Sequence, residues 1–370
     1  MQKKRFKILA PAVGRGVSLA AFCLALMLVL SPVSRQSVAA DSQTTLTQPL
    51  PAETQPASLP RVGGKLIPLG KTTGIKLFSR GTMVVGFSEL ESCGRCPARD
   101  GGLQEGDVLL KLNGQDITGN ESLTALLAEL PDENARFTVL RDEQEQTVPV
   151  KAVYDPALDC WRIGAWIRDS VAGIGTITFV DPETGVFGAL GHGICDADTG
   201  ELITFGTGSV MPSSVTRVEK SKNGTPGQLC GSFDLRLVQG WLAGNCESGI
   251  YGMLTREDLY AGTQPVEVAR RDEIHEGEAT ILSNVDGTET REYDVRIVKV
   301  YGGGQGREML LEVTDPDLLS VTGGIVQGQS GSPILQDGKL IGAVTHVLVN
   351  APARGYGISI ETMLEQLPAA

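Results

Sequence analysis

The chain has 370 residues, a net charge of −12 and 41% hydrophobic residues. This length allows two domains, and the composition is that of a folded protein with a sizeable core. The acidic balance argues against a nucleic acid partner, because phosphate binding needs a basic face. The 46 glycines indicate many turns and therefore a strand-rich protein.

The first 40 residues predict an export signal. Basic residues between positions 3 and 15 precede an apolar run from Val17 to about Leu30, and VAA at 38–40 is a small-residue cleavage site. The run is short for a membrane-spanning helix, so a cleaved signal peptide is favoured over a retained membrane anchor, although both remain open. Residues 41–63 are rich in Gln, Thr, Pro and Ala and predict a flexible linker. The body of the protein is therefore expected outside the cytoplasm.

Strands, turns and one helix alternate regularly after the linker. The run GGLQEGDVLLKLNGQDI, at 101–117, predicts a turn, a strand and a further turn, and a helix over 121–130 follows it. This run resembles a PDZ domain, which we expect over residues 64–150. Flanking strands are expected at 82–87, 137–141 and 147–150.

The PDZ resemblance implies a peptide-binding groove. A peptide C-terminus would add as an extra strand between a strand and the helix of the domain. The best match to the carboxylate-binding loop of that family is Gly74, Ile75, Lys76 and Leu77. The backbone amides of these residues would hold the peptide carboxylate. Protein substrates and peptide C-termini are therefore the expected partners.

Residues 151–370 predict a second, all-β domain. Short apolar or alternating runs with frequent glycine breaks are typical of a barrel or sandwich. Only the last stretch, Thr362 to Leu367, has a helical pattern. The strands expected here are 173–180, 280–283, 293–300, 309–313 and 340–349.

The string VQGQSGSPI, at 326–334, predicts a serine nucleophile. Ser330 stands between glycines, and glycine allows unusual backbone angles and close approach of a substrate. The amides of Gly328 and Ser330 could point at a developing oxyanion. The alternative is an ordinary Gly-Ser turn, so the motif needs a base and an orienting acid elsewhere in the chain. Ser330, rather than Ser332, is the expected nucleophile.

Only three histidines are candidates for the base. His192 follows a strand and stands in the glycine-framed turn LGHGI, which favours a side chain presented to a cleft. His346 lies within an apolar strand and is interpreted as a core residue, and His275 lies among glutamates and is interpreted as a surface residue. A neutral imidazole can remove the serine proton during attack, so we assign the base to His192.

The orienting carboxylate is less well defined. Asp315 comes directly after an expected strand and fifteen residues before Ser330, whereas Asp234 lies between His192 and Ser330. Asp196 is close to His192 in sequence, but neighbours four apart after a turn rarely face one another. The pattern puts Asp315 only slightly ahead, because Asp-Pro also opens turns.

Three strings, GALGHGICDADTG, VTDPDLLSVTGGIVQGQSGSPI and GAVTHVLVN, follow the PDZ-like run in this order. Together they resemble the SpoIVB (stage IV sporulation protein B) peptidase family. The resemblance implies a trypsin-like serine endopeptidase with a double β-barrel, in which His192, Asp315 and Ser330 form the catalytic set. The fold class expected is therefore mainly β, with a mixed α/β PDZ domain followed by the double β-barrel over residues 151–370.

The same resemblance implies a role in endospore formation. The peptidase would be exported from the forespore into the space between the forespore and mother-cell membranes, where it would cleave itself. It would then cleave a regulator of the membrane protease that matures pro-sigma-K. The PDZ domain is implied to bind the family's own chain and its targets, close to a membrane.

Gln329 stands where trypsin-like secreted enzymes usually carry an aspartate. In those enzymes the aspartate pairs with a new N-terminal amine and forms the oxyanion hole on activation. A neutral glutamine cannot make that ion pair. We therefore expect cleavage near the N-terminus to release the protein from a tether rather than to mature its active site.

Two other functions are considered. A catalytically silent PDZ scaffold would not need the complete set of His192, Asp315 and Ser330. A cysteine- or metal-based hydrolase would need a Cys–His pair or a His/Glu cluster at ligand spacing. The chain has no HExxH motif and only one CxxC, at 93–96, so we expect no metal and no cofactor. Six of the seven cysteines lie outside the signal segment, which permits disulfides without fixing their pairing; Cys195 is interpreted as a passive small residue.

Overall fold

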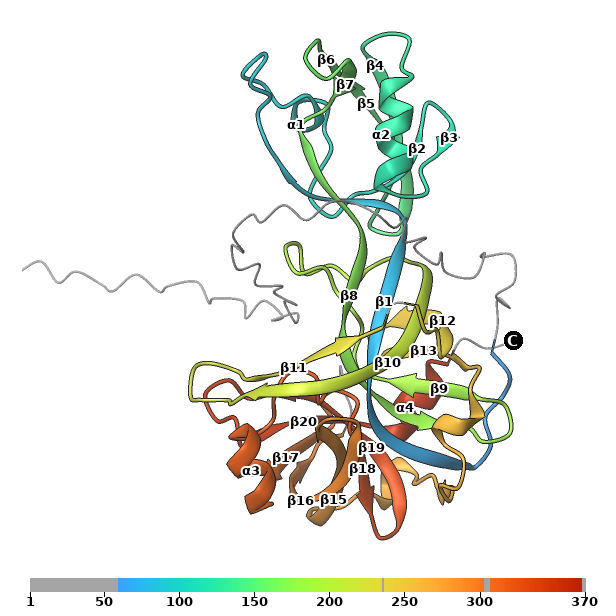
Figure 1. Cartoon of the computed structure of the whole chain (residues 1–370), viewed down its shortest axis with the longest axis vertical. Helices are drawn as coiled ribbons and strands as arrows, with labels where there is room; N and C mark the ends of the chain where they lie inside the picture. Colours follow the sequence, from blue (N-terminus) through green and yellow to red (C-terminus); the bar gives the residue numbers. More distant parts are fainter. Residues whose placement is uncertain (1–58, 235, 303–306, 368–370) are drawn as a thin grey trace, which may run out of the picture.

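The structure is a computed structural model that describes residues 59–234, 236–302 and 307–367. The predicted signal segment 1–40 and nearly all of the predicted linker 41–63 lie outside these residues. Within them the protein is mainly β, with a PDZ region at one end and two β-barrels at the other (Figure 1). The predicted fold class is confirmed.

The first barrel is a closed ring of six strands. Its pairing order is β10, β12, β13, β9, β8, β1 and back to β10, with β11 on the outer edge of β10 and β14 on the start of β1. The bounds are β1 (Lys65–Phe87), β8 (Ala165–Val180), β9 (Val186–Ala189), β10 (Phe205–Glu219), β11 (Gln228–Phe233), β12 (Gly240–Cys246), β13 (Gly249–Leu254) and β14 (Val266–Glu267). A short 3-10 turn, Glu257–Leu259, precedes β14.

The second barrel is closed in the order β15, β16, β17, β20, β19, β18. Two short helices, α3 and α4, follow β17 and β20, and a 3-10 turn, Arg271–Glu273, precedes β15. The bounds are β15 (Gly277–Asp286), β16 (Glu289–Val300), β17 (Met309–Val313), α3 (Pro316–Thr322), β18 (Pro333–Gln336), β19 (Lys339–Val347), β20 (Arg354–Ser359) and α4 (Ile360–Glu365).

The PDZ region lies between β1 and β8, which both run on into the first barrel (Figure 1). Its helix α2 matches the predicted helix at 121–130 to within two residues. The remaining bounds are α1 (Pro97–Asp100), β2 (Val108–Leu112), β3 (Gln115–Asp116), α2 (Asn120–Ala128), β4 (Asn134–Arg141), β5 (Gln144–Lys151), β6 (Val153–Asp155) and β7 (Cys160–Arg162).

Each of these three bodies has its own hydrophobic core. Leu109, Leu123 and Phe137 lie in the core of the PDZ region. Cores of this kind contribute about 25 cal/mol for each Å² of apolar surface removed from water, so each body has its own source of stability. Representative core residues are Leu77, Ile177 and Phe187 in the first barrel and Ile281, Val295 and Leu311 in the second.

The predicted boundary of the PDZ domain at residue 64 requires correction. Residues 67–78 of β1 pair with residues 170–180 of β8 inside the first barrel, and only the end of β1 joins the PDZ sheet. The PDZ region is therefore inserted between two strands of the peptidase body, and the simple order of residues 64–150 followed by 151–370 is wrong. Buried residues occupy β1 on both sides of this boundary, so the strand pattern carries no mark of it.

The predicted carboxylate-binding loop at Gly74, Ile75, Lys76 and Leu77 is also wrong. These residues lie in the middle of β1, paired on one side with β10 and on the other with β8. Gly74 is required because the Phe233 ring lies where a Cβ would stand. Since both edges of the strand are paired, this segment has no free backbone edge for a peptide.

Candidate active site

The Ser330 turn belongs to the second barrel and docks on the first. It leads into β18, and Gly328 and Gly331 adopt φ angles of 98° and 94°, which favour glycine. Thr176 of β8 holds the turn twice: its Oγ1 donates to the Gly328 carbonyl at 2.7 Å, and its amide donates to the Ser330 carbonyl at 3.1 Å. Thr176 thus fixes the turn at the interface between the barrels.

The predicted oxyanion donors remain available for a ligand. Neither the amide of Gly328 nor that of Ser330 donates a hydrogen bond to another residue of the described chain. The neighbouring Gly331 amide is used by the fold, since it donates to the Val344 carbonyl at 2.8 Å. Buried amides normally find acceptors, so two unused ones beside a serine are consistent with a substrate site. Their role stays a prediction.

Gln329 is buried and internally satisfied. Its Oε1 accepts from the Val326 amide at 2.9 Å, and its Nε2 donates to Ser283 Oγ at 3.0 Å. A glutamine fixed in this way supports the turn without an ion pair. Both ends of the Gln329 amide already have hydrogen-bond partners, which supports the expectation that no N-terminal amine is needed beside Gln329.

His192 stands just after β9 and next to the same interface. Leu190 and Gly191, which precede it, both have positive φ angles, of 71° and 69°, so the chain turns sharply there. Its Nδ1 hydrogen-bonds the Gly193 carbonyl at 2.9 Å, which makes Nδ1 the protonated nitrogen and leaves a lone pair on Nε2. Nε2 is buried and has no hydrogen-bond partner among the described residues. Burial lowers the pKa of His192, so the ring is neutral and able to act as a base.

The structure brings Ser330 and His192 into one site. Gly331, next to Ser330, lies against the Leu190 backbone, and Gly191 lies against the Thr345 side chain. The Ser330 hydroxyl donates to the Thr345 carbonyl at 2.8 Å. The Ser330 hydroxyl is therefore hydrogen-bonded to a backbone carbonyl of β19. The side chain would have to rotate about its Cα–Cβ bond to present the hydroxyl proton to His192.

His346 is a neighbour of the base that sequence reasoning missed. Its ring lies 5.2 Å from that of His192 between centroids, and its buried Nδ1 has no partner within the described chain. Burial, followed by unfavourable electrostatic interaction of a protonated His346 with His192 and Arg307, lowers the pKa of His346 to about 4. The interpretation as a satisfied core residue is therefore wrong. The sequence did carry a sign of this histidine, because His346 ends the string VTH in the strand that follows the serine turn.

Neither candidate carboxylate contacts His192. Asp315 caps the N-terminus of α3: one of its oxygens accepts from the Leu318 amide at 2.8 Å and the other from the Asp294 amide at 3.4 Å. Asp234 pairs with Arg236, which lowers the pKa of that carboxyl to about 2. The prediction that Asp315 orients His192 is contradicted by this geometry, because the Gly193 carbonyl occupies the position at Nδ1.

Asn245 is a further residue that the sequence did not point to. It lies near the end of β12 and reaches the loop after His192. Its Oδ1 accepts from the Ile194 amide at 2.8 Å, and its Nδ2 donates to the Ile194 carbonyl at 2.9 Å and the Ile203 carbonyl at 3.0 Å. These bonds hold the segment that supplies the acceptor for His192. Asn245 is therefore part of the frame that orients the base.

Free thiols and metal ligands are the features on which the other candidate chemistries depend. Cys93, Cys96, Cys160, Cys230 and Cys246 carry free thiols. No group of three or more His, Cys, Asp or Glu side chains in the described part of the chain is arranged to hold a metal ion. None of the helices within residues 59–367 that the structure describes has the length and apolar character of a membrane span.

The buried histidines make stability dependent on pH. A histidine whose folded pKa lies below its unfolded value of about 6.5 binds protons more strongly when unfolded, so stability is lost as the pH falls below 6.5. With a folded pKa of about 4, His346 should contribute a loss of about 2 kcal/mol between pH 7 and pH 5. We expect urea unfolding to show a smaller loss over this range in His346→Gln than in the wild type.

The matched control is His275→Gln. His275 is exposed and its pKa is raised by the hydrogen bond to Asp337, so its contribution has the opposite sign. This control should not reduce the loss between pH 7 and pH 5. An unchanged pH dependence in His346→Gln would contradict the assignment of a buried, neutral His346.

Comparison with known proteins places this site in a family. The model of the SpoIVB peptidase S55 family matches residues 159–364, and a PDZ domain model matches residues 94–141. Both Ser330 and His192 fall within the peptidase match. No curated protein matches the chain.

Several solved structures of proteases are similar at low identity. The HtrA-type protease AlgW with tripeptide is 15% identical, with 52% of this chain and 54% of that chain covered and a TM-score of 0.33. The Rv3671c protease from M. tuberculosis in its active form is 13% identical, with 54% and 76% covered and a TM-score of 0.31. The chain thus spans about half the length of the first of these. At these TM-scores the fold assignment rests on the strand pairing and the family match.

The peptidase match covers more than half of the chain and includes both barrels from β8 onward. It also contains the Ser330 turn and the neutral His192. The protein belongs to the SpoIVB peptidase S55 family and is a serine peptidase with a PDZ domain.

Proposed function

We propose that this protein is an exported, self-cleaving serine endopeptidase of the sporulation signalling pathway. Its second substrate would be a regulator of the protease that processes pro-sigma-K. The observation that carries the proposal is that the Ser330 turn packs, through Gly331, against Leu190 of the turn before His192, within the region matched by the SpoIVB peptidase family. The site of action would be the space between the forespore and mother-cell membranes, close to a membrane.

The proposed reaction uses the groups at this interface. The Ser330 hydroxyl turns from the Thr345 carbonyl to Nε2 of His192, which takes the proton as the oxygen attacks the scissile carbonyl. The amides of Gly328 and Ser330 receive the oxyanion, and one such donor contributes roughly 10²–10³-fold to the rate. His192 then gives its proton to the leaving amine. The Gly193 carbonyl keeps Nδ1 protonated throughout, so that Nε2 is the basic nitrogen.

Self-cleavage is tested by mixing two forms of the full chain. Wild-type protein is incubated with a tagged Ser330→Ala chain, which supplies cleavable polypeptide without its own nucleophile. We expect the wild type to shorten the tagged chain in trans, while Ser330→Ala alone stays intact. Processing of Ser330→Ala alone at the wild-type rate would contradict self-cleavage by this site and would favour a silent scaffold cut by another protease.

The PDZ region is proposed to bind peptide C-termini along β8, not along residues 74–77. From Ala165 to Arg168 this strand pairs with β1 on one edge, and the other edge has no strand partner within the described chain. Helix α2 runs antiparallel beside it: the Asn120 amide, at the start of α2, donates to Asp169 at 2.8 Å, and Trp161 Nε1 donates to a carbonyl beyond the helix end at 3.0 Å. A free strand edge next to a helix is the arrangement that accepts an added peptide strand.

The start of β8 also offers a carboxylate-binding turn. Gly164 has a φ angle of 73°, and Ile163, which precedes it, is in the PDZ core. Apolar side chains line the approach, with Ala165 and Ile167 on β8 facing the same core as Leu126 of α2. We therefore propose an aliphatic C-terminal residue as the preferred ligand.

A fluorescent decapeptide ending in valine tests this assignment on the full chain. The free carboxylate form should bind, and the same peptide with a C-terminal amide should bind at least about tenfold more weakly, because the turn offers amides to a charge. Equal affinity of the two forms would overturn the carboxylate site.

A further inference from the structure

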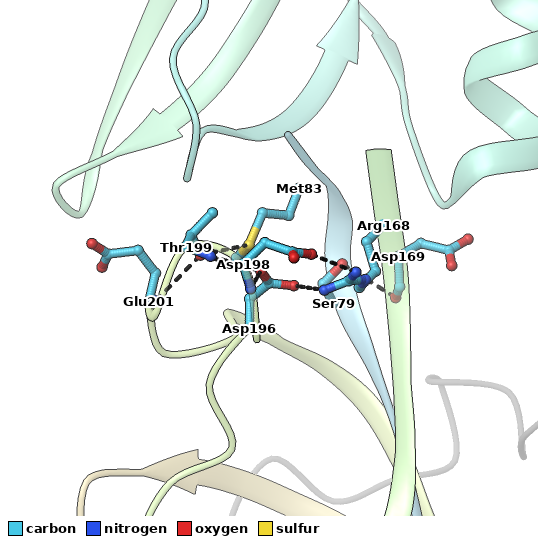
Figure 2. A network of polar contacts seen from close by, with 8 residues as sticks. All are labelled: Ser79, Met83, Arg168, Asp169, Asp196, Asp198, Thr199 and Glu201. Carbon is cyan, nitrogen blue, oxygen red and sulfur yellow. Dashed lines mark hydrogen bonds and ion pairs between the residues drawn. The ribbon is translucent and has the colours of Figure 1, made fainter. Parts of the chain in front are cut away.

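Two adjacent residues of β8 point to opposite sides of the strand and hold different parts of the protein. Asp169 accepts a hydrogen bond from the amide of Asn120 and so fixes the start of α2. Arg168 reaches the other way, to the loop that follows His192 (Figure 2). Successive side chains of a strand alternate in this manner, so β8 is a direct physical link between the PDZ helix and that loop.

Arg168 contacts two carboxylates of the loop. One Nη donates to Asp196, whose side chain is 1% exposed, and the other donates to Asp198 at 2.6 Å. Arginine suits this position because its planar group carries several donors and stays charged. Without Arg168, Asp196 would be a buried carboxylate with no charged partner, and such a charge is costly.

Asp196 in turn organises the loop. Its other oxygen accepts from the amides of Asp198 at 2.9 Å and Thr199 at 3.1 Å, and its own amide donates to the Glu201 carbonyl at 2.8 Å. Thr199 also contacts Met83 of β1, the residue that pairs with Arg168 across the sheet. The loop is therefore built around the Asp196 carboxylate that Arg168 holds.

The same loop carries the acceptor for the catalytic base. It begins at Gly193, whose carbonyl receives the Nδ1 proton of His192. The amide of Ile203 donates to the Ile194 carbonyl at 3.0 Å, so the two ends of the loop are tied together. A shift of the loop displaces the Gly193 carbonyl and turns the imidazole away from Ser330.

We propose that Arg168 is a positioning residue for His192 and that it transmits peptide binding at the β8 edge to the active site. The second part rests on the proposed peptide site. A peptide strand added to residues 165–168 gives β8 a second neighbour and restricts Arg168, which holds the loop in its working position. Binding should therefore activate the peptidase.

Labelling of Ser330 by a serine-directed fluorophosphonate tests the first part on the full chain without peptide. Arg168→Gln should lower the labelling rate roughly 100-fold, the size of effect expected from a small misplacement of a catalytic group. Arg168→Lys keeps a charge for Asp196 and should recover the rate to within about tenfold of the wild type. Arg162→Gln removes another Arg–Asp pair of the PDZ region, in which the arginine is exposed and which does not contact the loop after His192; it is the matched control and should label at the wild-type rate.

Unfolding in urea separates positioning from general destabilisation. Rates are compared under conditions where each variant is more than nine-tenths folded, as the unfolding curves define. If Arg168→Gln and the wild type label at the same rate, or if Arg168→Lys is no better than Arg168→Gln, Arg168 does not position His192.

The peptide arm tests the coupling. Saturating valine-carboxylate peptide should raise the wild-type labelling rate at least about fivefold, a coupling of ordinary size. Arg168→Gln should still bind the peptide, with an affinity within about fivefold of the wild type because coupling is reciprocal, and should show no rise in labelling rate. An equal rise in Arg168→Gln would overturn the coupling, and a wild type that binds the peptide without any rise would do so too. If no peptide binds to any form, the proposed peptide site fails, whereas the comparison without peptide still decides the role of Arg168.

Discussion

Replacing Ser330 with alanine should reduce hydrolysis of a protein substrate to background. The hydroxyl is the nucleophile of the proposed reaction, and loss of such a group costs on the order of 10⁶-fold in turnover. The fold should survive, because the change removes one hydrogen bond, to the Thr345 carbonyl, whose contribution is about 1 kcal/mol. Casein hydrolysis and thermal unfolding of the same preparation measure the two effects.

Ser332→Ala is the matched control. Ser332 lies two residues further along the same turn, is fully buried, and its hydroxyl has no hydrogen-bond partner in the described structure. Removing this hydroxyl should leave the hydrolysis rate within about threefold of the wild type, because the substitution breaks no hydrogen bond. Loss of activity in Ser332→Ala with retention in Ser330→Ala would reverse the assignment of the nucleophile.

Replacing His192 with glutamine should lower hydrolysis by a factor approaching that of Ser330→Ala. Serine and its base act as one unit, so removing either costs roughly the same, on the order of 10⁶-fold. Glutamine occupies a similar space but cannot accept the serine proton at neutral pH. The measurement is single-turnover labelling of Ser330 together with casein hydrolysis.

Asp315→Asn is the informative comparison for His192→Gln. In the structure Asp315 caps α3, and asparagine is an equally good cap, so activity should stay within about threefold and stability should hardly change. An aspartate that oriented the catalytic histidine would behave differently, because its change to asparagine costs roughly 10⁴-fold. A loss of that size with an intact fold would show that Asp315 reaches His192 in the active enzyme.

Asp315→Ala extends the comparison. Loss of the cap should lower the free energy of unfolding by about 1 kcal/mol and leave the labelling rate of the folded fraction unchanged. This result would identify the residue as structural. Comparison of Asp315→Asn with Asp315→Ala therefore distinguishes a capping role from a catalytic role.

The candidate nucleophile and the candidate base stand out in the sequence because each stands in a turn that glycines define. Gly328 and Gly331 do adopt positive φ angles around Ser330, and His192 does follow a strand and a sharp turn. The double barrel was predictable for a related reason, since short strands separated by turn residues leave few alternatives. Both inferences depend on local chemistry, and local chemistry is what a sequence records.

The acceptor at His192 and the proposed peptide site were not predictable for the opposite reason. Asp315 opens a helix, and an Asp-Pro pair has the same appearance whether its carboxylate caps that helix or meets a histidine 123 positions away in the chain. The Gly193 carbonyl leaves no mark in the sequence, because every residue has one. In both cases the outcome depends on which segments, distant in sequence, the fold brings together.

The PDZ region shows the same limit. Gly74 to Leu77 have the composition of a loop and strand start, yet β1 continues through them into the barrel, and Phe233 rather than a peptide lies over Gly74. The strand beside α2 comes instead from β8, beyond the sequence that matches the domain. The insertion of the PDZ region between two barrel strands depends on the topology of the whole chain and not on any local sequence pattern.

The central claim is that Ser330 is a nucleophile activated by His192. The most direct measurement is fluorophosphonate labelling of the full chain, followed by proteolysis and mass spectrometry of the modified peptide. We predict one label, on Ser330, that is lost in Ser330→Ala and slowed to background in His192→Gln. A label on any other residue, or labelling of Ser330 that proceeds at the wild-type rate in His192→Gln, would contradict the claim.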